Sequence, residues 1–460
     1  MIRRLADALS RWSARWVPDP FVIVILLTLV TMALVWALTG KDPIAALGAW
    51  GGRLKDGEVL GAERGLWSLL TFAMQMCLTL VTGHALAAAP PVRRGIARLV
   101  DRVPTARAAI IVTALVAMLA GFLNWGLGLI VGAVIARDMG RSLKRRGIRA
   151  HYPLIGAAGY TGLLVWHGGL SGSAPLKITR ASEIATVLPP GLNLDPLPLS
   201  ETIGSPLNLT VAALLLVGVP LALVLMRPRD EHVREIDAFA PGDDALPALP
   251  GGGGPARALD RSRILALIFA AAAFGYLGML VAKVGFGGID LNIINLFFLA
   301  VGLVLHGSPA AYGNAVGDAA KSTGGIILQF PFYAGIMGMM ALTGLIGVLA
   351  HAIGDAATPV TFGPLTFLSA GTVNLFVPSG GGQFAVQGPV VIEAAHQLGV
   401  PMGKAVMAFC YGDQWTNMLQ PFWALPLLGI TGLKVGDLIG YTAALMLLVL
   451  PLFIVPLILF

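Results

Sequence analysis

The stretch AGTVNLFVPSGGGQ, residues 370–383, is polar, rich in glycine and interrupted by a proline, yet it lies between two apolar segments. The string AGFLN at 120–124 repeats its AG-x-x-N pattern 250 residues upstream. Backbone that leaves the helix at membrane depth is tolerated only where it is buried in protein or lines a wet cavity. In a membrane protein, both stretches are therefore expected to be the tips of buried hairpins.

The composition indicates that class of protein. Of 460 residues, 56% are hydrophobic and only 12% carry a charge, which excludes an ordinary water-facing surface. Crossing a hydrocarbon core of about 30 Å takes roughly 20 helical residues. We therefore predict an all-α polytopic membrane protein, with apolar runs at 21–39, 66–88, 207–226, 263–283, 290–306, 325–350 and 436–460.

The basic residues predict how the chain is threaded, because Lys and Arg mark the cytoplasmic side. We place the N-terminus inside, let 104–142 and 361–397 return to the side they came from, and let 151–190 and 402–433 each cross once. This threading has two re-entrant hairpins and two interrupted helices, and it places 23 of the 31 Lys and Arg inside. Six lie outside, namely Lys41, Arg53, Lys55, Arg64, Lys283 and Lys404, and the remaining two, Lys177 and Arg180, are assigned to neither side.

An internal repeat supports the same threading. Tyr160 precedes Pro175 by fifteen residues, and Tyr411 precedes Pro426 by the same spacing, at an offset of 251. Each half then reads as helix, helix, hairpin, interrupted helix, helix.

The two halves are predicted to have opposite orientations, since 21–39 runs outward and 290–306 runs inward. An inverted repeat of this kind is typical of secondary transporters. We assign 1–226 to the first repeat and 263–460 to an extra helix plus the second repeat. Between them, 227–262 concentrates Asp, Glu, Pro and Gly without a periodic apolar face, and we interpret it as a cytoplasmic linker.

Four irregular loops are expected to enclose one cavity near the midplane. Two are the hairpin tips at 120–129 and 370–383, and two are the helix breaks WHGGLSGSAP (166–175) and GDQWTNMLQP (412–421). The N-terminal ends of half-helices suit an anion, whereas freed carbonyls and side-chain oxygens suit a small cation.

Candidate site residues come from these loops. We expect substrate contacts from Asn124, Trp125, Gly126, His167, Gly168, Gly169, Ser171, Ser173, Asn374, Ser379, Gly380, Gly381, Gln383, Thr416 and Asn417. Possible sodium ligands are Asn124, Ser171, Asn374, Asp413, Thr416 and Asn417. The two tip asparagines could instead cap hairpin arms, and the two serines could bond back to helix carbonyls. We expect the glycines at 380–382 to serve the backbone conformation.

Asp413 and His167 stand out because ionisable groups inside membrane segments are costly and mark an ion or substrate path. Asp413 could ligate sodium or carry a proton. His167 could bind a carboxylate, relay protons or make a structural hydrogen bond. Lys177 and Arg180 are the only cations close to a helix break, so the pocket suits a monoanion better than a multiply charged one.

The strings NWGLGL, WHGGLSGSAPL, VPSGGGQFAVQGP and YGDQWTNMLQPFW resemble the bacterial short-chain fatty acid transporter family, over nearly the whole chain outside 227–260. The resemblance implies a carrier in the bacterial inner membrane that moves a monocarboxylate such as acetoacetate or butyrate by alternating access, coupled to a cation gradient. It also implies membership of a superfamily of inverted-repeat carriers that are commonly homodimers. The Ser-Asn-Thr motif of its dicarboxylate branch is absent here, which leaves sodium and proton coupling both open.

Other classes of function are less consistent with the sequence. The main alternative is a channel or facilitator for small anions or neutral acids. No enzymatic activity is expected, because the chain has no H-E-x-x-H string, no D-D-x-x-D run and no nucleophile motif. We expect no cofactor other than a coupling sodium ion, and no nucleic-acid partner.

Overall fold

The computed structural model confirms a helical membrane protein. It describes residues 2–52, 54–55, 58–59, 65–184, 187–188, 192–239, 254–285, 291–348 and 357–460. Within these residues the only sheet is a pair of two-residue antiparallel strands, β1 (Leu54–Lys55) and β2 (Glu58–Val59). In the described part of the chain, seven helices are long and apolar enough to span a membrane: Pro20–Thr39, Gly65–Ala88, Ala106–Leu123, Pro206–Leu225, Arg263–Lys283, Gly324–Leu342 and Val435–Leu459.

Two apolar runs differ from their predicted lengths. The run at 290–306 is the helix Leu291–His306, whose 16 residues are short for a span. The run predicted at 325–350 ends as a helix at Leu342. Conversely, Ala106–Leu123, one arm of the first hairpin, is long enough to cross.

The first half begins with α1 (Ile2–Trp16). The elements that follow are α2 (Pro20–Thr39), α3 (Pro43–Gly51), α4 (Leu70–Ala88), α5 (Pro90–Asp101), α6 (Ala106–Leu123), α7 (Trp125–Arg145), α8 (Tyr152–Tyr160), the 3-10 helix η2 (Thr161–Leu164), α9 (Ser173–Lys177), α10 (Ala181–Ile184) and α11 (Pro206–Leu225).

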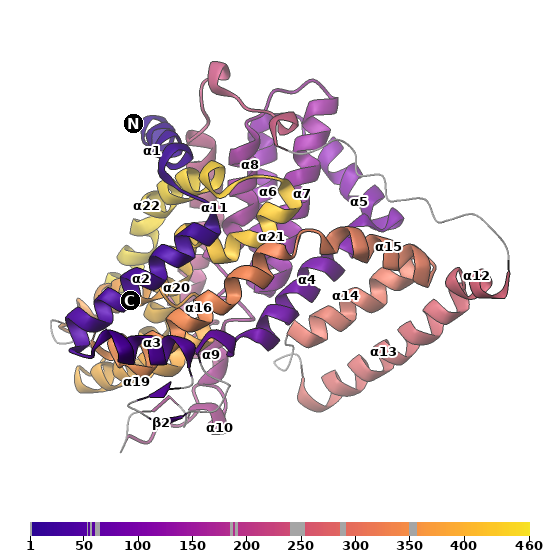
Figure 1. Ribbon diagram of the computed structural model, residues 1–460. Coiled ribbons are helices and arrows are strands. Elements are labelled where there is room, and N and C mark those ends of the chain that lie inside the picture. The colour runs from indigo at the N-terminus through magenta and orange to yellow at the C-terminus, as the bar shows by residue number, and fades with distance from the viewer. Residues whose placement is uncertain are drawn as a thin grey trace.

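The second half repeats this order after two intervening helices, α12 (Pro255–Asp260) and α13 (Arg263–Val284). Its elements are α14 (Leu291–His306), α15 (Pro309–Ala320), α16 (Gly324–Leu342), α18 (Phe362–Asn374), α19 (Gly380–Gln397), α20 (Met402–Thr416), the 3-10 helix η7 (Asn417–Leu419), α21 (Pro421–Thr431) and α22 (Val435–Leu459). The extra helix α13 lies at the edge of the molecule and packs mainly on α14 (Figure 1).

The two halves interlock through symmetry-related contacts. Helix α2 packs on α16, and its counterpart α14 packs on α4, the counterpart of α16. Each hairpin also packs on the broken helix of its own half, α6 on α8 and α18 on α20. These paired contacts are what the predicted repeat requires.

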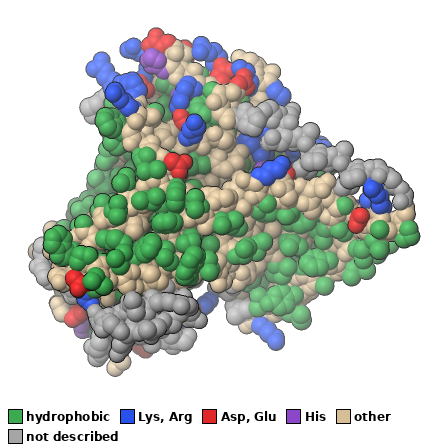
Figure 2. All heavy atoms as spheres, viewed as in Figure 1, with side chains coloured by type: hydrophobic (Ala, Val, Ile, Leu, Met, Phe, Trp, Pro, Cys, Tyr) green, Lys and Arg blue, Asp and Glu red, His purple; other side chains and the backbone are tan. Residues whose placement is uncertain are grey.

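The basic residues collect at one end of the molecule. The Ser13 hydroxyl of α1 donates to the carbonyl of Gly436 at the start of α22. Close by, Arg234 pairs with Asp437 at 2.9 Å, and Lys144 at the end of α7 pairs with Glu235 at 2.6 Å. The space-filling view shows the Lys and Arg side chains concentrated above a broad apolar belt (Figure 2). We refer to this part of the molecule as the basic end.

The directions of α2 and α14 are opposite relative to the basic end. The start of α2 shares a surface hollow with Arg234 and Lys434, so α2 begins at the basic end. Helix α14 finishes there instead, because the His306 ring contacts the carbonyl of Ala85, a few residues before the basic helix α5. Figure 1 shows the two helices running in opposite senses. The predicted inversion is therefore confirmed.

The predicted linker is not wholly separate from the membrane body. Its first residues dock at the basic end, where Ile236 is 5% exposed and the Tyr152 N–H donates to the carbonyl of Arg234. The ring of Phe239 lies 5.8 Å from that of Tyr152. Only two apolar side chains, Ile236 and Phe239, make this contact. Two residues do not produce a periodic apolar pattern, so the sequence showed no sign of the docking. Residues 240–253 of the linker lie outside the described part of the chain, as do Arg53 and Arg64.

Candidate functional site

Both predicted helix breaks are present, and they face each other. The first spans 165–172, between η2 and α9, and the second spans 417–420, between α20 and α21. The Tyr160 hydroxyl lies 2.9 Å from the carbonyl oxygens of both Asn417 and Gln420. Because Tyr160 ends α8, this contact ties the first broken helix to the break in the second.

The first hairpin turns at a single residue. Asn124 alone is extended between α6 and α7, and its Oδ1 accepts hydrogen bonds from the N–H groups of Gly126 and Leu127 at 2.9 and 3.1 Å. Asn124 therefore caps the N-terminus of α7, which is the alternative to a direct ligand contact. In the second hairpin this role belongs to Ser379, whose Oγ accepts from the Gly382 N–H at 3.3 Å.

Asn374 lies in a different environment from Asn124, although the two strings match. It is 0% exposed, and its Nδ2 lies 2.9 Å from the Asp413 carbonyl, 3.0 Å from Thr416 Oγ1 and 2.9 Å from Asn417 Oδ1. The Asn374 Oδ1 is buried without a protein partner. Because an unpaired buried acceptor costs about 1–3 kcal/mol, this oxygen marks a place where a ligand would be stabilising.

Asp413 and His167 are in direct contact at the centre of the site. His167 Nδ1 lies 2.6 Å from Asp413 Oδ2, and the side chains are 0% and 1% exposed. The Ala174 backbone N–H, which can only donate, lies 3.2 Å from His167 Nε2. Nε2 is therefore the unprotonated acceptor, and the proton on Nδ1 points at Asp413.

The charge of this pair follows from the tautomer. A histidine protonated only on Nδ1 is neutral, so it donates to Asp413 without cancelling a carboxylate charge. The second carboxyl oxygen, Oδ1, is buried and has no protein partner. Buried oxygens without a protein partner in the described residues therefore include Asp413 Oδ1 and Asn374 Oδ1, together with Gln383 Oε1 and Gln420 Oε1.

The start of α19 closes over this pair. A Cβ atom added at Gly380 would lie 2.6 Å from His167 Cε1 and 2.8 Å from Trp166 Cη2. The glycines 380–382 form the first helical turn, and none has a positive φ. At Gly380, close packing on His167 and Trp166 leaves no room for a Cβ atom, whereas no left-handed backbone conformation requires glycine there.

The first tip contacts the first break. The Trp125 N–H donates to Ser171 Oγ at 3.0 Å, and the Trp125 ring packs edge-on against Trp166 and Trp423, with centroids 6.4 and 5.1 Å apart. Ser173 Oγ lies 3.1 Å from His167 Nε2. Among the described residues, neither Ser171 nor Ser173 donates a hydrogen bond to a helix carbonyl, which was the alternative role considered for them.

The loops contact one another through particular pairs, and the single cavity expected near the midplane stays a prediction. The first break contacts both tips, whereas no hydrogen bond joins the two tip asparagines among the described residues. Thr416 and Asn417 lie with Asn374, and Gly168 and Gly169 are buried in the first break. Gln383 is 0% exposed, and its Nε2 donates to the carbonyl of Ala370 inside the second hairpin.

Three amides that the sequence did not single out hold the loops in place. Gln414 Oε1 accepts from the N–H groups of both His167 and Gly168 at 3.1 Å. Gln420 Nε2 donates to the Asn374 carbonyl, and Asn208 Nδ2 donates to the Gly168 carbonyl. Two features of the sequence could have identified these amides. The two glutamines lie inside the break string at 412–421, and Asn208 is a polar residue within an apolar run.

The loops bring together a carboxylate, an imidazole, amides and a hydroxyl. In the described residues there is no group of three or more His, Cys, Asp or Glu side chains that could hold a metal ion. Carboxylate, amide, hydroxyl and carbonyl oxygens are the kinds of ligand that hard cations prefer. Arg180 lies apart from this centre and pairs with Glu183 at 2.7 Å.

Known proteins resemble this chain along its whole length. A family model described as "Short chain fatty acid transporter" matches residues 1–460. A protein of Escherichia coli (strain K12) is 40% identical over 463 residues, covering 100% of both chains. One of Haemophilus influenzae is 37% identical over 465 residues, covering 99% of both. The names of both relatives assign them to short-chain fatty acid transport without stating a measured activity.

One solved structure is also similar. It is the crystal structure of the Alcanivorax borkumensis YdaH transporter, at 17% identity and a TM-score of 0.41, covering 96% of this chain and 98% of that one.

Proposed function

The chain belongs to the family of short-chain fatty acid transporters, and from this premise we propose that it is a secondary active transporter of short-chain monocarboxylates, such as acetoacetate or butyrate. Transport is coupled to a cation gradient and proceeds by alternating access between two orientations of the site. The protein is a multi-pass membrane protein. We place it in the bacterial inner membrane with the basic end, and hence the N-terminus, in the cytoplasm.

The observation that carries cation coupling is the buried Asp413 carboxylate beside a neutral imidazole. An unneutralised charge that is 1% exposed costs several kcal/mol. A cation removes that cost, so its binding and the packing of the four loops stabilise each other. We favour sodium over a proton, because two unpaired oxygens from different residues, Asp413 Oδ1 and Asn374 Oδ1, are available. A proton would need only one of them.

The substrate carboxylate is proposed to bind at the start of α19. The helix N-terminus there carries a partial positive charge, and Ser173 is among the nearest side chains that a Cβ added at Gly380 or Gly381 would meet. A cation held by Asp413 would add attraction for the same carboxylate. The absence of a lysine or arginine among the residues named for this site favours a monoanion over a dicarboxylate.

Gradient-driven uptake into proteoliposomes tests the proposal against the channel alternative. Purified protein should accumulate radiolabelled butyrate above the external concentration when sodium is imposed outside, and valinomycin-clamped controls should separate sodium from membrane potential. A channel or facilitator would only equilibrate butyrate. Equilibration under both an imposed sodium gradient and an imposed proton gradient would exclude secondary active transport.

We also propose a homodimer, from the superfamily resemblance. Light scattering of the purified protein in detergent, with the detergent mass subtracted, should give twice the 47.9 kDa chain mass. A single chain mass at all protein concentrations would contradict this.

A further inference from the structure

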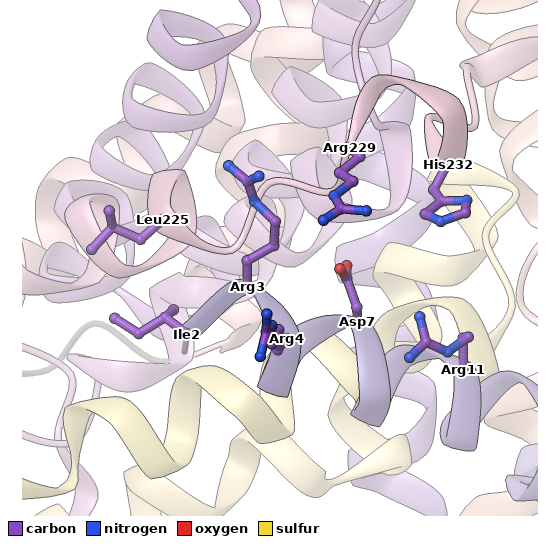
Figure 3. A pocket seen from close by; sticks show the side chains of 8 residues that line it. All are labelled: Ile2, Arg3, Arg4, Asp7, Arg11, Leu225, Arg229 and His232. Carbon is purple, nitrogen blue, oxygen red and sulfur yellow. The ribbon is translucent and has the colours of Figure 1, made fainter.

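A basic pocket lies at the basic end, away from the four loops. It has a volume of about 860 Å³ and lies between α1, the end of α11 and the segment that follows it. Figure 3 shows the side chains that line it, which are Ile2, Arg3, Arg4, Asp7, Arg11, Leu225, Arg229 and His232.

The pocket has an excess of positive charge. Four arginines and one aspartate line it. Among the described residues, no ion pair is formed by Arg3, Arg4 or Arg11, and Arg229 has only Glu231 at 3.8 Å, with both side chains more than 60% exposed. Guanidinium groups that outnumber the acidic side chains around them attract an anion, and phosphate is the anion whose geometry they match best.

The position of the pocket fixes its depth in the membrane. Leu225 is the last residue of α11, one of the helices that can span the bilayer. Helix α1 buries Ala6 and Ser13 against the body, while Trp12 and Trp16 are 56% and 65% exposed. Amphipathic helices with exposed tryptophans lie in the interface between hydrocarbon and water. The arginines are therefore at the level of the lipid headgroups.

We propose that this pocket binds the headgroup of an anionic phospholipid. The phosphate lies among Arg3, Arg4, Arg11 and Arg229, and the acyl chains pass the apolar side chains of Ile2 and Leu225 into the bilayer. These two apolar residues favour a lipid over a soluble phosphate, which would gain nothing from them. The site is independent of the proposed transport reaction.

Native mass spectrometry of the detergent-solubilised protein, titrated with phosphatidylglycerol or phosphatidylcholine, tests the assignment. The wild type should bind phosphatidylglycerol more tightly than phosphatidylcholine. The variant Arg3→Gln/Arg4→Gln/Arg11→Gln should lose that preference, with affinity weakened roughly 10- to 100-fold, since each basic residue near an anionic lipid contributes about 1 kcal/mol. Its substitutions face the pocket and leave the buried Ala6 and Ser13 unchanged.

The matched control removes three arginines from another amphipathic helix at the same end, as Arg93→Gln/Arg94→Gln/Arg98→Gln in α5. This variant should keep the wild-type preference. An equal loss in both variants would show general charge attraction and overturn the site, as would equal binding of the two lipids by the wild type.

Two further measurements address the source of the anion and the pocket itself. Inorganic phosphate at millimolar concentration should not displace phosphatidylglycerol, and displacement would overturn the lipid assignment in favour of a soluble anion. Asp7→Asn removes the only acidic side chain that lines the pocket and should tighten phosphatidylglycerol binding several-fold. Unchanged binding would place the lipid elsewhere. Size-exclusion profiles of all variants check their folding.

Discussion

Asp413 sits 1% exposed against an imidazole that can donate a hydrogen bond but supplies no charge. A carboxylate in that position is far more stable with a cation beside it, and the neutral amide of asparagine has no such requirement. The size of the two side chains is nearly the same, so the substitution removes charge with little change in packing.

Asp413→Asn is therefore expected to abolish gradient-driven accumulation of butyrate in proteoliposomes. A sodium-coupled protein should also lose sodium-stimulated counterflow, whereas a proton-coupled one should keep exchange, because the neutral side chain imitates the protonated carboxyl. Accumulation and counterflow are measured with and without sodium, across pH. Accumulation at the wild-type level under either gradient would make Asp413 structural and leave His167 as the next candidate.

Gly380 offers a second test at the scale of one methyl group. In Gly380→Ala the new Cβ would overlap the His167 ring and Trp166 Cη2, at 2.6 and 2.8 Å. Overpacking of this kind costs roughly 1–3 kcal/mol, so transport and thermal stability should both fall.

Gly381→Ala is the control for that substitution. Its Cβ would meet Ser173 Cβ at 3.5 Å, an ordinary contact, and the helix turn is the same. The two variants should differ clearly in melting temperature, a readout that does not depend on substrate binding at the start of α19. Equal melting temperatures would mean that α19 does not press on His167.

At the scale of elements, the two hairpin tips differ in what holds them. Asn124 caps α7, so Asn124→Ala should lower stability by about 1 kcal/mol and Asn124→Ser should restore it. Asn374 contacts Asp413, Thr416 and Asn417 instead.

Asn374→Ala should therefore weaken sodium-dependent butyrate binding, and Asn374→Ser should not restore it. Binding by scintillation proximity and melting temperature, measured on the same preparations, separate the two effects. Loss of binding in Asn124→Ala with an unchanged melting temperature would contradict this division of roles.

The sequence predicted where the helices are interrupted, because glycine, proline and polar residues inside apolar runs are local signals. It did not predict that Ala106–Leu123 would be long enough to cross. The AG-x-x-N strings correctly marked both tips. They did not reveal that α19, the second arm of the second hairpin, would be capped by Ser379 rather than by Asn374. Where a helix ends depends on what its last residue contacts, and the partners of Asn374 lie 39 to 43 residues away.

The roles of Gln414, Gln420 and Asn208 could not be predicted from the sequence, because their partners are also distant along the chain. Gln414 accepts from His167, which is 247 residues distant, and Asn208 binds both Gly168 and Tyr411. A buried amide needs partners, but nothing in the local string names them. The sequence also identified His167 and Asp413 as candidate site residues, but it did not predict that they would contact each other.

At the scale of the whole molecule, the threading predicts two distinct labelling patterns. Single cysteines at Arg145 or Glu231, whose side chains are 58% and 62% exposed, should react only with membrane-permeant maleimides in intact cells. A cysteine at Gln397, an exposed position at the end of α19, should react with impermeant ones.

The two natural cysteines should contribute little labelling of their own. The natural Cys77 and Cys410 are 7% and 0% exposed, so they should label slowly. Labelling of position 231 from outside the cell would invert the threading and place the basic end outside.

The contact between His167 and Asp413 joins residues 246 positions apart, which constrains when the protein can be completed during synthesis. A ribosome adds about 5–20 residues per second, so the first broken helix waits roughly 10–50 s in the bilayer before its partner has been translated. During that interval, the N–H groups of His167 and Gly168 lack the acceptor that Gln414 later supplies. We therefore expect a chain truncated before Asp413 to be less stable in the membrane than the full chain, because the first break would keep these polar groups without partners.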